Sequence, residues 1–166
     1  MGKRKVAIVI IILLLCMQVF FAVPELLYGG GRFWLRAFTY SFFHANWAHL
    51  AGNCIAVWSL YRDPCKPCRD LLFPFLIAVA VYPLAMRPIV GFSNVIYAAI
   101  GLRTPSLRSS WWRRTPVLVF LAITVLLQFI PQFSTRTHIA AFAAGMLLAA
   151  IRRGWLILTR DARRYY

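Results

Sequence analysis

Acidic residues are scarce in this chain of 166 residues, which holds 4 Asp and Glu against 19 Lys and Arg. All of them lie outside the long apolar runs, at Glu25, Asp63, Asp70 and Asp161. A carboxylate-lined channel or transporter, a buried proton relay and a Ser-His-Asp triad each need an acid inside the fold, so the sequence argues against all three. Charge of either sign is also rare, at 14% of residues.

Apolar side chains make up most of the chain instead, with 61% hydrophobic and 16% aromatic residues. A net charge of +15 suggests a nucleic-acid binder at first sight. However, long apolar runs separate the basic residues, and no helix face carries a basic stripe. The aromatic content excludes a disordered chain. The apolar composition and the positive charge together fit a multi-pass membrane protein with basic loops. We expect no nucleic-acid partner.

Six apolar segments are candidates to cross a hydrocarbon core of about 30 Å. They are residues 6–23, 47–61, 71–86, 93–102, 116–130 and 138–151, and residues 24–46 form a long outer loop. The first segment resembles a signal peptide, but its apolar run is longer than the roughly 7–15 residues of a signal sequence and no cleavage site follows. We expect a single all-α membrane domain over 1–166, with a short interfacial helix or a frayed tail after Arg152.

The basic residues predict the orientation of these spans, because cytoplasmic loops carry an excess of Lys and Arg. With the N-terminus in the cytoplasm, 15 of the 19 basic residues fall inside, and the exceptions are Arg32, Arg36, Arg87 and Arg136. An odd number of spans would break this alternation. We therefore expect both termini in the cytoplasm, and the basic loops without a transit-like leader favour a bacterial plasma (inner) membrane.

Polar residues inside spans are the candidates for function, since they are costly there. Ser93, His138 and the pair His49 and Asn53 each lie about 14–21 Å from the first cytoplasmic charge on their own helices. All four are therefore expected in the middle-to-outer half of the bilayer. The fourth span is too short to cross by itself, so residues 87–92 are expected to dip into the bilayer as a loop.

Spacings of three and four residues place these candidates on facing helix stripes. Ser93, Tyr97 and Gly101 share one face, and His138 shares another with Ala141, Gly145 and Ala149. Small residues at this spacing let membrane helices approach closely. The two helices are thus expected to bring Ser93 within hydrogen-bond reach of His138.

Three stretches, in this order, resemble motifs of the rhomboid family of intramembrane serine proteases. RAFTYSFFHANWAHLAGN resembles the outer-loop and second-helix pattern H-x-x-x-x-H-x-x-x-N, and GFSNVIYAAIG resembles G-x-S-G with Tyr four residues on. THIAAFAAG resembles the sixth-helix pattern A-H-x-x-G-x-x-x-G. With the six expected spans, the resemblance covers most of residues 6–151.

The resemblance implies a serine endopeptidase that cleaves transmembrane protein substrates without a cofactor. It makes Ser93 the nucleophile and His138 the general base. Asn53, His49 and the Ser93 backbone N–H would form the oxyanion hole. The implied supporting residues are Tyr97 under the His138 ring, Gly91 where the loop approaches substrate, Gly145 in the helix contact, and Arg36 and His44 in the outer loop, with Arg36 bonding backbone carbonyls.

Three residues depart from the family pattern. Asn94 and Ala141 stand where the family has Gly, and Leu35 stands where its loop often has Trp. Extra side chains at 94 and 141 are expected to widen the contact between the two helices and to lengthen the Ser93–His138 distance. They favour the alternative class, a non-catalytic rhomboid-like protein that binds membrane clients without cutting them.

The remaining metal and redox candidates are weaker. Three His without a nearby acid argue against a metal site. Cys65 and Cys68 form a C-x-x-C, but no second pair completes a zinc site, and the expected cytoplasmic location keeps thiols reduced. We interpret them as two free thiols, with metal binding or redox sensing as the alternative.

Overall fold

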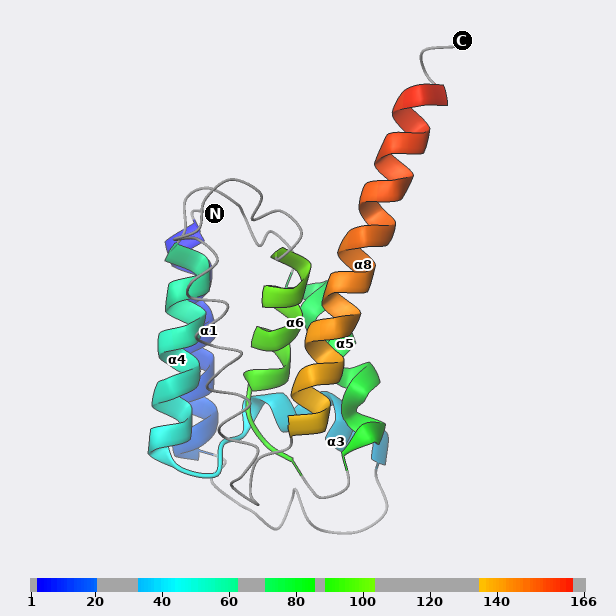
Figure 1. The fold of residues 1–166 in the computed structure, drawn as a ribbon. Coiled ribbons are helices and arrows are strands. Elements are labelled where there is room, and N and C mark those ends of the chain that lie inside the picture. The colour runs from blue at the N-terminus through cyan, green and yellow to red at the C-terminus, as the bar shows by residue number, and fades with distance from the viewer. Residues whose placement is uncertain (1–2, 21–32, 63–70, 86–88, 104–134, 163–166) are drawn as a thin grey trace.

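The computed structural model describes residues 3–20, 33–62, 71–85, 89–103 and 135–162, and within these ranges it contains helices and turns but no strand. The elements are α1 (Lys3–Phe20), α3 (Phe33–Thr39), η1 (Tyr40–Phe42), α4 (Trp47–Arg62), α5 (Leu72–Val81), η2 (Tyr82–Leu84), α6 (Ser93–Arg103) and α8 (Thr135–Ala162). Figure 1 shows α1 and α4 side by side, with α6 between this pair and α8. α5 packs against both α6 and α8.

Five of the six expected spans fall on described helices, and the span expected at 116–130 lies outside the described residues. The structure adds detail to two other expectations. Residues 33–42 of the expected outer loop are helical, as α3 and η1, because this stretch contains no Gly or Pro and buries Ala37 and Tyr40 in the core. α8 does not end near Arg152 but runs unbroken to Ala162. Beyond Arg152 the one glycine is Gly154, and one Gly costs about 1 kcal/mol, too little to end a long helix.

α6 is the central helix of the described bundle. It has 11 residues, about 16 Å of helix, and every residue from Asn94 to Gly101 is buried. A short non-helical stretch that contains Gly91 leads into its first residue, Ser93. The expectation that this helix is too short to cross a bilayer by itself is confirmed, and Ser93 at its start is half-buried.

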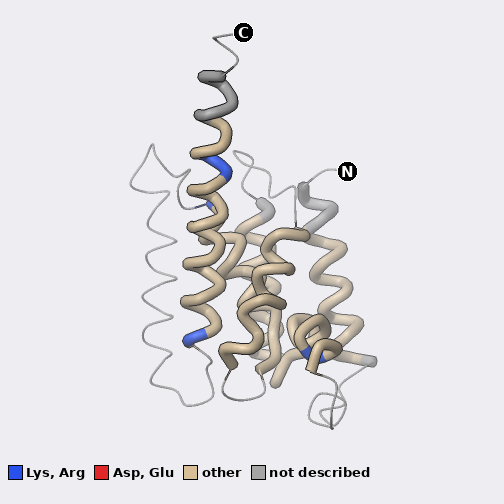
Figure 2. Tube along the Cα trace, turned by 90° about the vertical axis from the view of Figure 1, so that its right-hand side faces the viewer, with Lys and Arg blue, Asp and Glu red and all other residues tan. Residues whose placement is uncertain are grey.

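The outer faces of the peripheral helices are apolar. Large hydrophobic side chains such as Ile8, Ile55, Leu72 and Leu147 are exposed on α1, α4, α5 and α8. Within the described part, Thr135–Leu156 is long and apolar enough to cross a membrane, and Ala7–Val19 and Leu72–Leu84 are shorter apolar helices. Figure 2 shows basic residues at the start of α8 and again well before its end, with none between these two places.

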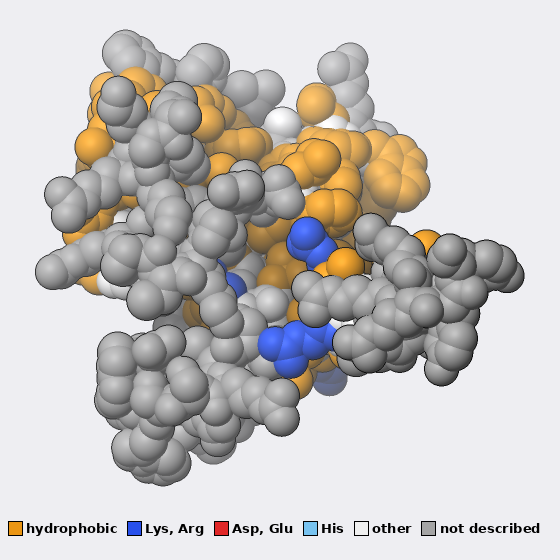
Figure 3. All heavy atoms as spheres, turned by 90° about the horizontal axis from the view of Figure 1, so that it is seen from above, with side chains coloured by type: hydrophobic (Ala, Val, Ile, Leu, Met, Phe, Trp, Pro, Cys, Tyr) orange, Lys and Arg blue, Asp and Glu red, His pale blue; other side chains and the backbone are white. Residues whose placement is uncertain are grey.

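The start of α1 and the end of α8 point to the same end of the bundle (Figure 1). α6 also ends toward this side, with Arg103 in its last turn. Figure 3 looks onto this end, where basic side chains lie among hydrophobic ones. Ser93 and His138, at the starts of α6 and α8, lie toward the opposite end.

Candidate active site

The contact between α6 and α8 depends on two glycines. A Cβ on Gly101 would collide with the Phe142 carbonyl oxygen, and a Cβ on Gly145 would collide with that of Ala98. Ala141 is fully buried in the same contact. The two expected stripes of small residues therefore face each other, and the helix backbones touch, as small residues permit in membrane bundles.

This close approach brings the first residue of α6 to the first turn of α8. The Ser93 Oγ lies 2.8 Å from the His138 Nε2, a hydrogen-bond distance. The hydroxyl donates this bond when the imidazole carries its proton on Nδ1, which leaves Nε2 as the acceptor. The expected juxtaposition of Ser93 and His138 is confirmed. The expectation that Asn94 and Ala141 lengthen this distance is wrong.

Asn94 leaves the Ser93–His138 contact intact because its side chain points elsewhere. Successive residues on a helix are turned by about 100°, so Asn94 does not share the face of Ser93. Its Nδ2 donates a hydrogen bond of 2.9 Å to the Tyr40 hydroxyl. Ala141 fits as well, since its methyl group is buried among residues that include Val81 and Tyr97.

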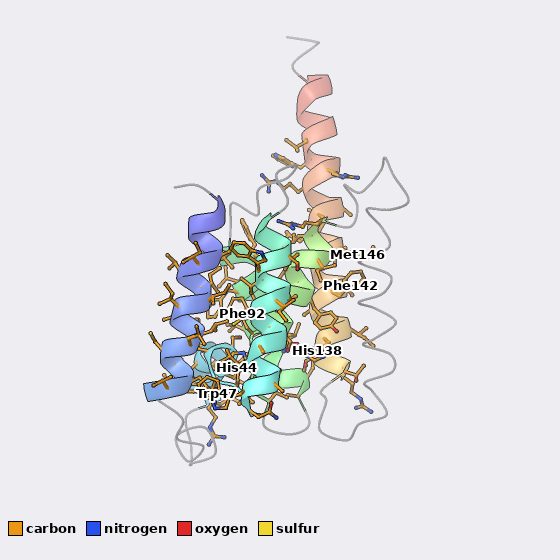
Figure 4. All side chains as sticks on the ribbon, turned by 90° about the vertical axis from the view of Figure 1, so that its left-hand side faces the viewer. His44, Trp47, Phe92, His138, Phe142 and Met146 are labelled. Carbon is orange, nitrogen blue, oxygen red and sulfur yellow. The ribbon has the colours of Figure 1, made fainter. Side chains whose placement is uncertain are left out.

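Tyr97 lies one turn after Ser93 and stacks on the imidazole of His138. The ring centroids are 4.6 Å apart and the planes differ by 17°. This flat contact fixes the plane of the imidazole, as the family resemblance implied. Figure 4 shows His138, Phe142 and Met146 on successive turns of α8, with His138 nearest the start of the helix.

His49 and Asn53, one turn apart on α4, meet the chain at Gly91. Gly91 has a φ of +117°, and a Cβ there would lie 2.5 Å from the His49 Cε1 and 3.4 Å from the Asn53 Nδ2. Only glycine suits both this backbone conformation and this space. Both polar side chains are therefore held against the loop two residues before Ser93.

The Asn53 amide is buried, and its Nδ2 has no hydrogen-bond partner among the described residues. An unpaired buried donor costs about 1–3 kcal/mol, so such groups are rare in folded proteins and call for an explanation. A hydrogen bond from this donor to a substrate oxygen would explain why it has no partner within the protein.

Comparison with protein families matches a rhomboid domain to residues 31–66 and 70–155, more than half of the chain. The chain belongs to the rhomboid family. This membership establishes an all-helical integral membrane protein, in agreement with the described helices. No curated protein and no solved structure matches the chain.

In this rhomboid protein, His44 lies between η1 and α4, and its ring packs edge-on against that of His49 at 5.2 Å. Burial, together with the nearby His49, lowers the pKa of His44 to about 4. His44 is therefore neutral near pH 7 and supports the His49 ring from the outer-loop side. Figure 4 shows His44 and His138 toward the same end of the bundle.

Arg36 lies in the last turn of α3. It is half-buried, and its Nε has no hydrogen-bond partner among the described residues. Its expected bonds to backbone carbonyls stay a prediction. Leu35 is exposed on the same helix.

Within the described ranges, the rhomboid bundle contains no group of three or more His, Cys, Asp or Glu that could hold a metal ion. Cys16 and Cys54 are free. Cys65 and Cys68 lie outside the described residues, so their interpretation as free thiols is untested.

Tyr40 is the residue near the site that sequence reasoning missed. It is almost fully buried, and it contacts the chain on both sides of Ser93. A signal was present, because Asn94 puts an amide where the family has a small residue, and a buried amide needs a partner. Nothing in the sequence, however, indicated which residue that partner would be.

Proposed function

We propose that this rhomboid chain is an intramembrane serine endopeptidase that hydrolyses peptide bonds of transmembrane proteins. The observation that carries the proposal is the 2.8 Å contact between the Ser93 Oγ and the His138 Nε2. A nucleophile within hydrogen-bond reach of a base, whose ring is oriented by a third group, has the geometry of covalent catalysis. Tyr97 is that third group here.

Ser93 attacks the scissile carbonyl carbon while the His138 Nε2 takes the hydroxyl proton. The tetrahedral intermediate collapses, the peptide C–N bond breaks, and His138 delivers the proton to the leaving amine. Water then attacks the acyl ester on Ser93 and loses a proton to His138. The ester C–O bond breaks, and His138 returns that proton to the Ser93 Oγ. The dyad needs no carboxylate for this sequence of steps, because Tyr97 supplies the orientation of the imidazole.

Asn53, His49 and the Ser93 backbone N–H stabilise the oxyanion in this proposal. The unpaired Asn53 Nδ2 and the contact of both α4 side chains with Gly91 support it. Preorganised donors of this kind contribute about 10²–10³-fold each to the rate of acyl transfer. Gly91 lets a substrate strand approach the same loop closely.

The proposal includes the topology that the charge distribution favours. The single domain crosses the bilayer six times, with both termini in the cytoplasm of a bacterial inner membrane. The site then lies in the middle-to-outer half of the bilayer, and substrates reach it from the lipid. Substrate helices must unwind at the scissile bond, since a helix hides its carbonyl groups.

The test is cleavage of a single-span reporter in proteoliposomes by the native chain and by Ser93→Ala and His138→Ala. Ser59→Ala is the matched control, because Ser59 is exposed on α4 away from the dyad. We expect cleavage by the native chain and the control, and loss of at least about 10³-fold in both dyad variants. A folded chain that cuts no reporter but retains transmembrane clients would instead be a non-catalytic binder.

A further inference from the structure

Tyr40 in η1 is hydrogen-bonded through both its backbone and its side chain. Its carbonyl oxygen accepts a bond of 3.0 Å from the Gly91 N–H. Its hydroxyl donates a bond of 2.9 Å to the Ala78 carbonyl oxygen in α5. The same hydroxyl accepts a bond of 2.9 Å from the Asn94 Nδ2.

These bonds end on either side of Ser93. Gly91 lies two residues before the serine and Asn94 one residue after it, so one residue of the outer-loop segment holds both flanks. Tyr40 and Asn94 are each 1% exposed, so water does not compete for the bonds between them. The Tyr82 ring packs against the Tyr40 ring, with centroids 5.0 Å apart, and limits its movement.

We propose that Tyr40 and Asn94 form a positioning pair that fixes the backbone around Ser93. Asn94 thus has a role of its own here, as the anchor of α6 to η1 and, through the Tyr40 hydroxyl, to α5. Neither side chain is bonded to His138, so the pair acts through the position of Ser93. Its effect on rate rests on the proposed protease function, whereas its effect on the backbone does not.

The physical consequence of breaking the pair follows from burial. Without the Tyr40 hydroxyl, the Asn94 Nδ2 has no acceptor for its hydrogen bond in an apolar interior, and the first turn of α6 must shift or admit water to satisfy it. A shift of about 1 Å in a nucleophile costs about 100-fold in rate. Substrate binding along the rest of the site is unaffected.

The test compares Tyr40→Phe, Asn94→Ala and the double variant with the native chain. Tyr82→Phe is the matched control, because it removes a phenol hydroxyl from the adjacent ring and leaves the bond to Asn94 in place. Two quantities are measured, namely hydrogen–deuterium exchange over residues 91–94 and the rate at which a fluorophosphonate labels Ser93. Reporter cleavage supplies kcat and KM separately.

We expect both single variants to speed exchange over residues 91–94 at least about tenfold and to slow labelling about 10–100-fold. KM stays within about twofold of the native value, and exchange at the Gly101–Gly145 contact is unchanged. The double variant is no slower than the worse single variant, because both changes break one interaction. Tyr82→Phe behaves like the native chain.

Unchanged exchange and labelling in both single variants would overturn the positioning pair and leave the protease proposal standing. Additive losses in the double variant would also overturn it. A native chain that is never labelled, but whose exchange responds to Tyr40→Phe, would refute the protease proposal and keep the pair.

Discussion

The Tyr97 ring lies flat against the His138 imidazole, with 4.6 Å between the centroids, while the Ser93 Oγ sits 2.8 Å from the Nε2 of the same imidazole. Both contacts arise from one helix, because Ser93 and Tyr97 are one turn apart on α6. The orientation of the His138 imidazole and its distance from the Ser93 hydroxyl are therefore set together by how α6 packs on α8.

Replacing Tyr97 tests the stacking contact. In Tyr97→Ala the imidazole loses the surface that fixes its plane, and we expect kcat of reporter cleavage to fall about 10–100-fold. Tyr97→Phe keeps the ring and is expected to retain most of the activity. Equal losses in both variants would assign the role to the hydroxyl and contradict orientation by stacking.

A substitution at Gly145 tests the contact between α6 and α8 that holds Ser93 next to His138. In Gly145→Ala the new Cβ meets the Ala98 carbonyl oxygen and pushes α8 from α6, and we expect a loss of about 1–3 kcal/mol in the free energy of unfolding. Gly154→Ala on the same helix has open space around it and is expected to be neutral or stabilising by up to about 1 kcal/mol. Thermal unfolding in detergent gives the comparison. Equal stability of the two variants would mean that the backbones do not touch at Gly145.

A substitution at Gly91 tests the position of the loop that precedes Ser93. Gly91→Ala places a methyl group against His49 at a φ of +117°, and such strain costs about 1–3 kcal/mol. We expect the variant to lose most reporter cleavage, because the loop moves away from His49 and Asn53. Gly52→Ala is the control on α4, where a Cβ meets nothing within 4 Å. Native activity in Gly91→Ala would contradict the placement of this loop.

The lowered pKa of His44 predicts that the free energy of unfolding falls at acidic pH. Its pKa is about 4 in the folded chain against the ordinary 6.5, so the unfolded chain binds the proton more readily. His44 therefore destabilises the fold as pH falls from about 6.5 toward 4, by about 3 kcal/mol in total. In His44→Gln this part of the loss should disappear, which unfolding at pH 7 and at pH 4.5 would show. An unchanged pH dependence would mean that His44 titrates normally.

The helix contact and the dyad could be predicted from the sequence because both depend on local spacing. Small residues four apart define which faces of α6 and α8 can meet, and Ser93 and His138 lie on those faces. The spacing of His49 and Asn53 placed both on one face of α4 for the same reason. Each of these inferences depends on spacing within a single helix and not on how the loops connect the helices.

The outer segment and the role of Asn94 could not be predicted in this way. Residues 33–42 are helical because Tyr40 and Ala37 are buried against helices distant in sequence, which local propensity does not indicate. Asn94 was expected to widen the contact between the helices because its side chain is larger than glycine. Local spacing does not indicate its hydrogen-bond partner, Tyr40, which lies 54 residues earlier in the chain. A helix after Arg152 was one of two expected alternatives, but its continuity with the preceding span was not predicted, because a change from apolar to basic residues does not end a helix.

The most direct test of the central claim is mass spectrometry of the folded chain after reaction with a fluorophosphonate. We expect one modified residue, Ser93, with no modification in His138→Ala and an unchanged yield in Ser59→Ala. A folded native chain that stays unmodified at Ser93, or one that reacts equally well without His138, would contradict that claim.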